Sequence, residues 1–259
     1  MPMESAREFA TVISSLCQHR LMDTADFLRI FDIEHEAFLA SCERAGSVAK
    51  VPSCPGWSVS DLLYHLYEVQ YAWRRVTAEG RTSFSGIGLP DRPDDNHLAA
   101  VVRSEHDNYS AMLRGLDPGA SIWTWIGTRD VAWLARRMAH ETAMHRVDAD
   151  LAAGVAAPIE ASLASDGIDE FFEIFLNPVN GAVNGSVHIH CTDVAGEWTV
   201  REVGGAFDVR REHAKGDAAI RGAANDILMA LWRRGPLSAC DVVGDAEAAA
   251  RFVAASQLE

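Results

Sequence analysis

The chain lacks a long apolar run, a paired cysteine motif and an excess of basic residues. No stretch approaches the run of about 18 apolar residues that a membrane-spanning helix needs, so we expect no membrane segment. The five cysteines are scattered and include no CxxC pair, which favours reduced thiols in a cytoplasm over a disulfide framework. The formal net charge of −14 argues against a nucleic-acid partner, because phosphate contacts need clustered Lys and Arg.

Internal repeats and low-complexity tracts are also absent, and no signal peptide is predicted. The N-terminal stretch carries acidic side chains and no sustained apolar core. We interpret residues 1–23 as an arm or a short extra helix. At 259 residues, the chain is long enough for one large domain or two ordinary ones.

Apolar residues recur at helical spacing in four segments of the first half. Asp23 or Thr24 can cap the first segment, and Ser58 with Asp61 forms a near capping box for the second. The segments span about residues 24–45, 59–78, 95–116 and 130–152. They predict a four-helix bundle over residues 24–155, an architecture that builds metal sites from inward side chains on facing helices.

The character of the sequence changes after Gly154. A linker rich in Ala, Pro and Ser over residues 156–167 is followed by an amphipathic helix over 166–179. Three segments then alternate in strand fashion, at residues 186–193, 196–203 and 206–213. Two helices follow, one at about residues 223–233 and a last one through Phe252. We predict a separate, smaller α+β domain over residues 160–259.

One predicted helix, Trp133–Asp150, concentrates metal-ligating side chains. Glu141 and His145 are four residues apart, so they lie one turn above the other and reach a common point beside the helix. A catalytic zinc usually has three protein ligands, so a third must come from elsewhere. His140 lies five residues before His145, which excludes the H-E-x-x-H motif of zinc proteases and directs His140 away from the pair.

His65, on the second predicted helix, is a candidate for the third ligand. It lies on the inward stripe of that helix with Leu62, Leu66 and Val69. A histidine on an apolar face is more often a core residue with a hydrogen-bond partner than a metal ligand. The residues alone leave both interpretations open.

Five separated segments of the chain carry a family resemblance. They read, in order, PSCPGWSVSDLLYHL, RRMAHETAMHRVDAD, GSVHIHCTDVAGEWTV, GAANDILMALWRRGPL and VVGDAEAAARF. They resemble the mycothiol-dependent maleylpyruvate isomerase family of actinobacteria, and the resemblance covers nearly everything from residue 24 onward. It implies a DinB-like four-helix bundle followed by that family's smaller C-terminal α+β domain.

The resemblance also implies a set of site residues. A divalent metal, generally zinc, is expected on His65, Glu141 and His145, and two imidazoles with one carboxylate leave the open position that catalytic zinc requires. Arg234 is similar to an arginine that this family uses near its active site, where it can bind a carboxylate through two hydrogen bonds. This chain reads W-R-R-G-P there, whereas family members tend to read W-G-R-R-P.

Mycothiol, a low-molecular-weight thiol, is the cosubstrate that the resemblance implies. Metal coordination favours the thiolate, which attacks an electrophilic small molecule, one that can carry carboxylates. The outcome is cis–trans isomerisation of maleylpyruvate to fumarylpyruvate or thiol S-transfer, and the residues do not choose between them. The alternative hypothesis is a non-catalytic metal-binding or ligand-sensing protein of the same fold. We expect a monomer or a homodimer.

Several polar residues beside the predicted ligands have two interpretations each. Asp148 can accept the other imidazole N–H of His145, or it can form a surface ion pair. Arg136 and Arg137 can bind an anionic substrate group, although salt bridges along the helix face are favoured. Cys54 is interpreted as a packing residue and not as a nucleophile.

Other histidines are interpreted as having no part in the site. His188 and His190 share one strand face, and an outward polar face is favoured over a second metal pair. His35, inside an acidic cluster, is predicted to lie on a solvated helix face. His97 and His106 are predicted to be exposed.

Overall fold

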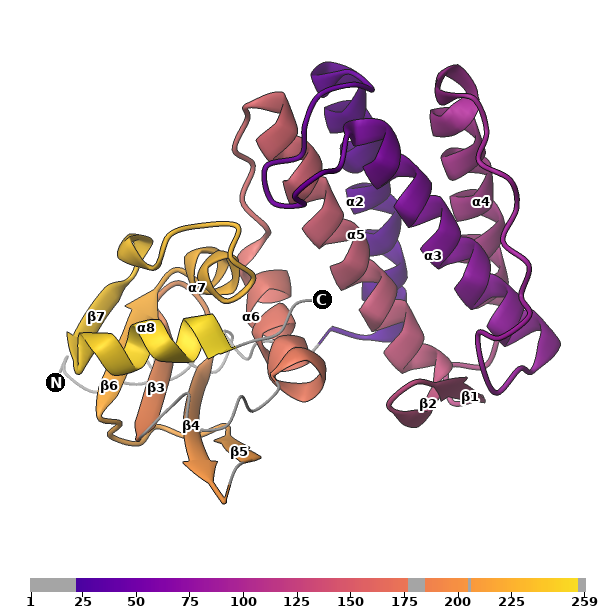
Figure 1. The fold of residues 1–259 in the computed structure, drawn as a ribbon. Helices are drawn as coiled ribbons and strands as arrows, with labels where there is room; N and C mark the ends of the chain where they lie inside the picture. The colour runs from indigo at the N-terminus through magenta and orange to yellow at the C-terminus, as the bar shows by residue number, and fades with distance from the viewer. Residues whose placement is uncertain (1–21, 177–184, 205, 256–259) are drawn as a thin grey trace, which may run out of the picture.

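The computed structural model describes residues 22–176, 185–204 and 206–255 (Figure 1). Nearly all of the predicted N-terminal arm therefore lies outside the described residues. A bundle of long helices forms one half of the molecule, and a mixed sheet with shorter helices forms the other. The predicted four-helix bundle followed by a smaller α+β domain is confirmed.

Within the described chain, the bundle helices agree closely with the predicted segments. They are α2 (Thr24–Ala45), α3 (Val59–Glu79), α4 (Asp95–Gly115) and α5 (Val131–Ala153). Ser58 and Asp61 form the predicted capping box at the start of α3. A short hairpin precedes α5, formed by β1 (Ser121–Thr124) and β2 (Gly127–Asp130). The side chain of Asp130 accepts a hydrogen bond from the N–H of Trp133 at 2.8 Å and so caps α5.

The order of the bundle is set by the long segment between α3 and α4. This segment returns along the bundle, because the hydroxyl of Tyr64, near the start of α3, donates to the carbonyl of Pro90 at 3.0 Å. α3 and α4 therefore run in the same direction. α2 and α5 lie side by side in the opposite direction, joined by the ion pair of Glu34 and Arg146 at 2.8 Å. This up-down-down-up order lays the middle of α5 against the start of α3.

The segment after the bundle is helical where a linker was predicted. α6 (Ala161–Glu170) continues directly into a π-helical turn (Phe171–Phe175). The linker predicted over residues 156–167 is therefore wrong for its second half, and the helix predicted over 166–179 begins too late.

The small residues of α6 explain the wrong prediction. Gly167 packs so closely against the bundle that a Cβ added there would lie 3.3 Å from Nδ1 of His140. Small side chains that permit such close packing resemble a linker in composition. The helix is also capped, because the Glu160 side chain accepts a hydrogen bond from the N–H of Leu163 at 3.2 Å.

A mixed sheet forms the core of the second half. Its described strands are β3 (Ser186–Cys191), β4 (Glu197–Val203), β5 (Ala206–Arg210), β6 (Ala218–Gly222) and β7 (Asp241–Gly244). They lie in the order β5-β4-β3-β6-β7, with β3 and β6 parallel and the other neighbours antiparallel. The sequence pattern does not predict β6 and β7, which are five and four residues long. The accompanying helices are α7 (Ala224–Leu231), a 3₁₀ turn (Leu237–Ala239) and α8 (Ala246–Ala255).

The two halves share one hydrophobic core. A single cluster of buried side chains includes Met138 and Ala139 of the bundle together with Ile168 of α6, Val187 of β3 and Leu228 of α7. The sheet half is thus packed against α5, the helix that carries Glu141 and His145. None of the described helices is long and apolar enough to cross a membrane.

His35 and His106 are buried, which contradicts their predicted exposure, whereas His97 is exposed as predicted. The rings of His35 and His106 stack between α2 and α4, with centroids 3.8 Å apart and an angle of 9° between their planes. Neither ring nitrogen of His35 has a hydrogen-bond partner among the described residues. Burial, with smaller contributions from His106 and Arg103, lowers the pKa of His35 to about 2. The charges of the neighbouring acidic residues suggested a solvated face, but the ring itself points into the helix interface.

This burial predicts acid sensitivity of the fold. The unfolded chain binds a proton at His35 near pH 6.5 and the folded chain does so only near pH 2, so the free energy of unfolding falls as the pH drops below 6.5. Between pH 7 and pH 5 we expect His35 to account for a loss of about 2 kcal/mol. Chemical denaturation at both pH values should show a smaller loss for His35→Phe, whereas His97→Phe should behave like the wild type. Equal losses in His35→Phe and wild type would contradict the assignment.

Candidate metal centre

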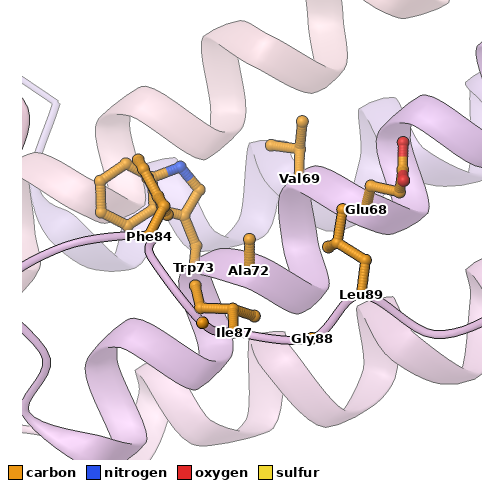
Figure 2. Close-up of a pocket in the computed structure, with 9 residues that line it drawn as sticks. Glu68, Val69, Ala72, Trp73, Phe84, Ile87, Gly88 and Leu89 are labelled. Carbon is orange, nitrogen blue, oxygen red and sulfur yellow. The ribbon is translucent and has the colours of Figure 1, made fainter.

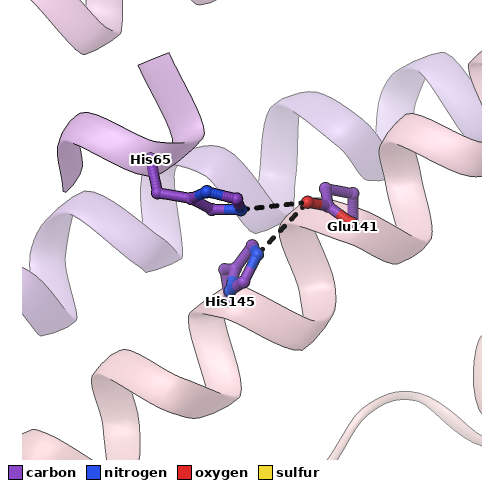
Figure 3. Close-up of side chains that lie close together, drawn as sticks. All are labelled: His65, Glu141 and His145. Carbon is purple, nitrogen blue, oxygen red and sulfur yellow. Dashed lines mark hydrogen bonds and ion pairs between the residues drawn. The ribbon is translucent and has the colours of Figure 1, made fainter. Parts of the chain in front are cut away.

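The packing of α3 against α5 brings His65, Glu141 and His145 together (Figure 3). Oε1 of Glu141 lies 3.2 Å from Nε2 of His145 and 3.6 Å from Nε2 of His65. The two imidazole rings meet at a centroid distance of 4.9 Å and an angle of 78°. Glu141 and His145 are neighbours on one face of α5, and the antiparallel helix α3 brings His65 to the same point.

These residues fit a divalent metal in donor type and placement. One ligand atom from each residue lies within 4.8 Å of the others, and two imidazole nitrogens with a carboxylate oxygen form the donor set of catalytic zinc sites. His65 is partly exposed, so the cluster remains open on one side. We propose that the three residues are ligands of a divalent metal, Zn²⁺, that keeps one position for a substrate atom.

Asp148 holds His145 in the orientation that this proposal needs. Its carboxylate is fully buried, and Oδ2 lies 2.9 Å from Nδ1 of His145, which leaves Nε2 of the ring directed at Glu141. The hydroxyl of Ser53 donates to Oδ1 of the same carboxylate at 2.5 Å. The interpretation of Asp148 as an acceptor for the imidazole matches this geometry, and a surface ion pair does not.

Arg234 reaches Asp148 from the other half of the molecule. Its Nε and Nη2 groups donate to Oδ1 and Oδ2 of Asp148, both at 2.9 Å, in a bidentate pair. The turn after α7 makes this possible: Arg233 adopts a φ of 57°, and the N–H of Arg234 donates to the carbonyl of Met229 at 2.9 Å. Arg234 therefore reaches the site even though the residue order W-R-R-G-P differs from that of the family.

Arg136 and Arg137 form ion pairs, in line with the favoured interpretation. Arg137 pairs with Glu141 and also, through Nη1, with Oε2 of the buried Glu170 at 3.0 Å. It thereby holds one oxygen of Glu141 and leaves the other for the cluster. Arg136 pairs with Asp166 at 2.6 Å. Glu170 was not a candidate in the sequence, because no short spacing connects it with Arg137.

His140 and Cys54 lie outside the set of ligands. Nε2 of His140 lies 2.6 Å from Oδ2 of Asp166 on α6, which agrees with the expectation that it faces away from His145. Burial, with the nearby Asp148 charge as the next cause, raises the pKa of the Cys54 thiol to about 11. A thiol with so high a pKa is a poor nucleophile at neutral pH, which agrees with a packing role.

The cluster is strongly polarised when no metal is bound. Burial opposes charge on both groups, but the neighbouring Arg137 and His145 hold the pKa of Glu141 well below its ordinary value. Glu141 and the Asp148 hydrogen bond in turn raise the pKa of His145 to about 9. At neutral pH the metal-free cluster therefore contains an imidazolium, and a divalent cation would replace that proton.

An apolar cavity of about 540 Å³ lies along α3 (Figure 2). Val69 and Ala72 follow His65 by four and seven residues, so they lie on the same face of the helix, about 6 and 10 Å further along it. The cavity is lined by Glu68, Val69, Ala72, Trp73, Phe84, Gly86, Ile87, Gly88 and Leu89. Its one charged side chain is an acid.

The fold and the cluster define a class: a helical bundle with an inward His–His–Glu set, fused to a smaller α+β domain. Residues 28–150 match the family model of the mycothiol maleylpyruvate isomerase N-terminal domain, and residues 162–251 match that of the MDMPI C-terminal domain. The chain belongs to the mycothiol-dependent maleylpyruvate isomerase family, as the resemblance implied.

Two solved structures share the fold. They are the crystal structure of the mycothiol-dependent maleylpyruvate isomerase, with a TM-score of 0.57, and that of a histidine-to-alanine mutant of the enzyme, with a TM-score of 0.59. Each is 10% identical in sequence, and each match covers 80% of this chain and 88% of the other. No curated protein matches the chain.

The proposed ligands make a direct prediction about metal content. After loading with Zn²⁺ and removal of excess ion, His65→Ala and His145→Ala should each retain one zinc fewer per chain than the wild type, because two remaining ligands bind zinc weakly. Elemental analysis of the purified proteins measures this. The exposed His97→Ala serves as the matched control and should retain the wild-type content. Wild-type zinc content in both ligand variants would end the assignment.

Proposed function

We propose that this protein is a metal-dependent enzyme that uses mycothiol, with a thiolate attacking an electrophilic small molecule. The observation that carries the proposal is the convergence of His65, Glu141 and His145 on one point that stays open on one side. Mycothiol is proposed as the thiol because the chain belongs to this family and the solved relatives are named as mycothiol-dependent maleylpyruvate isomerases.

A bound divalent cation would favour the ionised form of the mycothiol thiol at neutral pH. The protein residues then have defined tasks. Asp148 keeps His145 in one tautomer and orientation, and Arg137 keeps one oxygen of Glu141 directed at the cluster. Arg234 neutralises the buried charge of Asp148, and we propose that its remaining N–H groups bind a carboxylate of the substrate.

The two reactions that the sequence left open, isomerisation and thiol S-transfer, differ in the fate of the thiol adduct. In the isomerase reaction, the thiolate adds to a carbon of the cis double bond of maleylpyruvate, rotation follows, and elimination of the thiol gives fumarylpyruvate. In thiol S-transfer, the conjugate is released. The apolar cavity on the His65 face of α3 favours transfer to an apolar electrophile as the second candidate, because Glu68 would repel a dicarboxylate there.

The proposal predicts turnover that depends on the cluster. Zinc-loaded wild type should convert maleylpyruvate, or an apolar electrophile such as 1-chloro-2,4-dinitrobenzene, only when mycothiol is present. His65→Ala should lose about 100-fold or more in kcat/KM, and His97→Ala should not. Product formation is followed by absorbance. Binding of mycothiol without conversion of any electrophile would favour the ligand-sensing alternative.

The cavity makes a separate prediction about the acceptor. Ala72→Trp adds a large side chain to the lining of the cavity without touching the three ligands. If the cavity holds the electrophile, kcat/KM for an apolar electrophile should fall about tenfold while zinc content is unchanged. Glu68→Gln, on the same cavity, should instead improve the turnover of anionic substrates. An Ala72→Trp enzyme with wild-type kinetics would exclude the cavity as the acceptor site.

A further inference from the structure

A second cluster of metal-ligating side chains lies in the sheet half, away from the bundle cluster. His188 and His190 share one face of β3, and Glu197 of β4 stands directly opposite His190 in the strand register. His213, after β5, folds back to the same carboxylate. None of the elements that carry these residues contributes to the His65 cluster.

One carboxylate oxygen of Glu197 lies near the rings of His188, His190 and His213. Oε1 of Glu197 is hydrogen-bonded to Nδ1 of His190, lies 2.9 Å from Nδ1 of His213 and lies 4.0 Å from Nε2 of His188. The rings of His188 and His213 meet edge to face at 5.1 Å. Ligand atoms of His188, His190 and Glu197 all lie within 4.8 Å of one another. The ligand atoms of His65, Glu141 and His145 lie within the same distance of one another.

His188 is the member that an outward polar strand face does not explain. The residue is only 8% exposed, and its Nε2 atom has no hydrogen-bond partner within the described part of the chain. A buried polar atom without a partner is costly, so its placement beside Glu197 calls for a ligand between them. The preferred sequence interpretation of an outward face is therefore wrong for His188, which lies in the interior.

We propose that His188, His190, Glu197 and His213 form a second binding site for a divalent transition metal. Imidazole and carboxylate donors suit Zn²⁺, Cu²⁺ and Ni²⁺. In a tetrahedral zinc site with bonds of about 2.0–2.1 Å, neighbouring ligand atoms lie about 3.3 Å apart. The ligand atoms of His188, His190 and Glu197 lie within 4.8 Å of one another, and His213, which contacts Glu197 and has a side chain 77% exposed, is free to rotate toward them as the fourth ligand.

The ligand count separates this site from the bundle site. Three protein ligands leave a position for a substrate, whereas four protein ligands close the coordination shell, as in structural zinc sites. The ion would join β3, β4 and the segment after β5, and so stabilise the outer edge of the sheet. Arg221, which stands beside His190 on β6, adds a positive charge that disfavours further positive charge at His188, and Glu197 is the carboxylate that offsets it.

The test uses a full-length His65→Ala/His145→Ala double variant, in which the bundle site is removed. After treatment with a chelator, this protein is titrated with Zn²⁺ by calorimetry, and its thermal midpoint is recorded with and without the ion. We expect one zinc per chain and a higher midpoint on binding, because an ion that binds only the folded state stabilises it. Failure of this double variant to bind zinc would overturn the second site and leave the proposed enzyme function untouched.

Two further substitutions in that background identify the ligands. Glu197→Gln and His213→Ala should each weaken zinc binding about tenfold or more, and His97→Ala should leave it unchanged. His213 is exposed, so its removal is not expected to unfold the chain, and circular dichroism checks this. Co²⁺ in place of zinc should give the visible absorption of four-coordinate cobalt with imidazole ligands. Unchanged affinity in both Glu197→Gln and His213→Ala would also overturn the site.

Discussion

The buried carboxylate of Asp148 is the constraint on which the relation between the two halves depends. It receives hydrogen bonds from His145 on α5, from Ser53 before α3 and from Arg234 after α7. A carboxylate removed from water is tolerated only when it is paired and fully hydrogen-bonded, so all three segments must be in place at once. The carboxylate that orients His145 is consequently fully paired only when the sheet half is docked against the bundle.

The same dependence appears along the rest of the interface. Arg137 of α5 divides its guanidinium between Glu141 and Glu170, and His140 pairs with Asp166. The contacts with Glu170 and Asp166 join α5 to α6 beside a shared apolar core. A charged group on α5 that could have bound substrate is thereby committed to structure, and the surroundings of Glu141 and His145 are held rigidly. Rigid support of this kind is what a metal site with an open position requires.

The two histidine–carboxylate clusters show how different secondary structures reach the same chemistry. On a helix, residues four apart share a face, which joins Glu141 and His145 on α5. On a strand, residues two apart share a face, which joins His188 and His190 on β3. In both clusters a neighbouring element supplies a further partner, His65 from α3 in one case and Glu197 from β4 in the other. In the proposed metal sites, the bundle cluster keeps one position for a substrate, and the sheet cluster closes with a fourth protein ligand.

The sequence by itself determined the features that depend on local spacing. The bundle helices, the pairing of Glu141 with His145 and the exclusion of His140 follow from the 3.6-residue period, and the family resemblance added His65 and Arg234. Short strands and the small-residue helix α6 were beyond it, because tertiary packing outweighs their weak local signal.

Only the tertiary structure decided the partners that lie far apart in the chain. It buried His35 between two helices, set Arg234 on Asp148 and placed Glu197 opposite His190. Helix packing and strand register fix such contacts, and neither leaves a short-range pattern in the sequence.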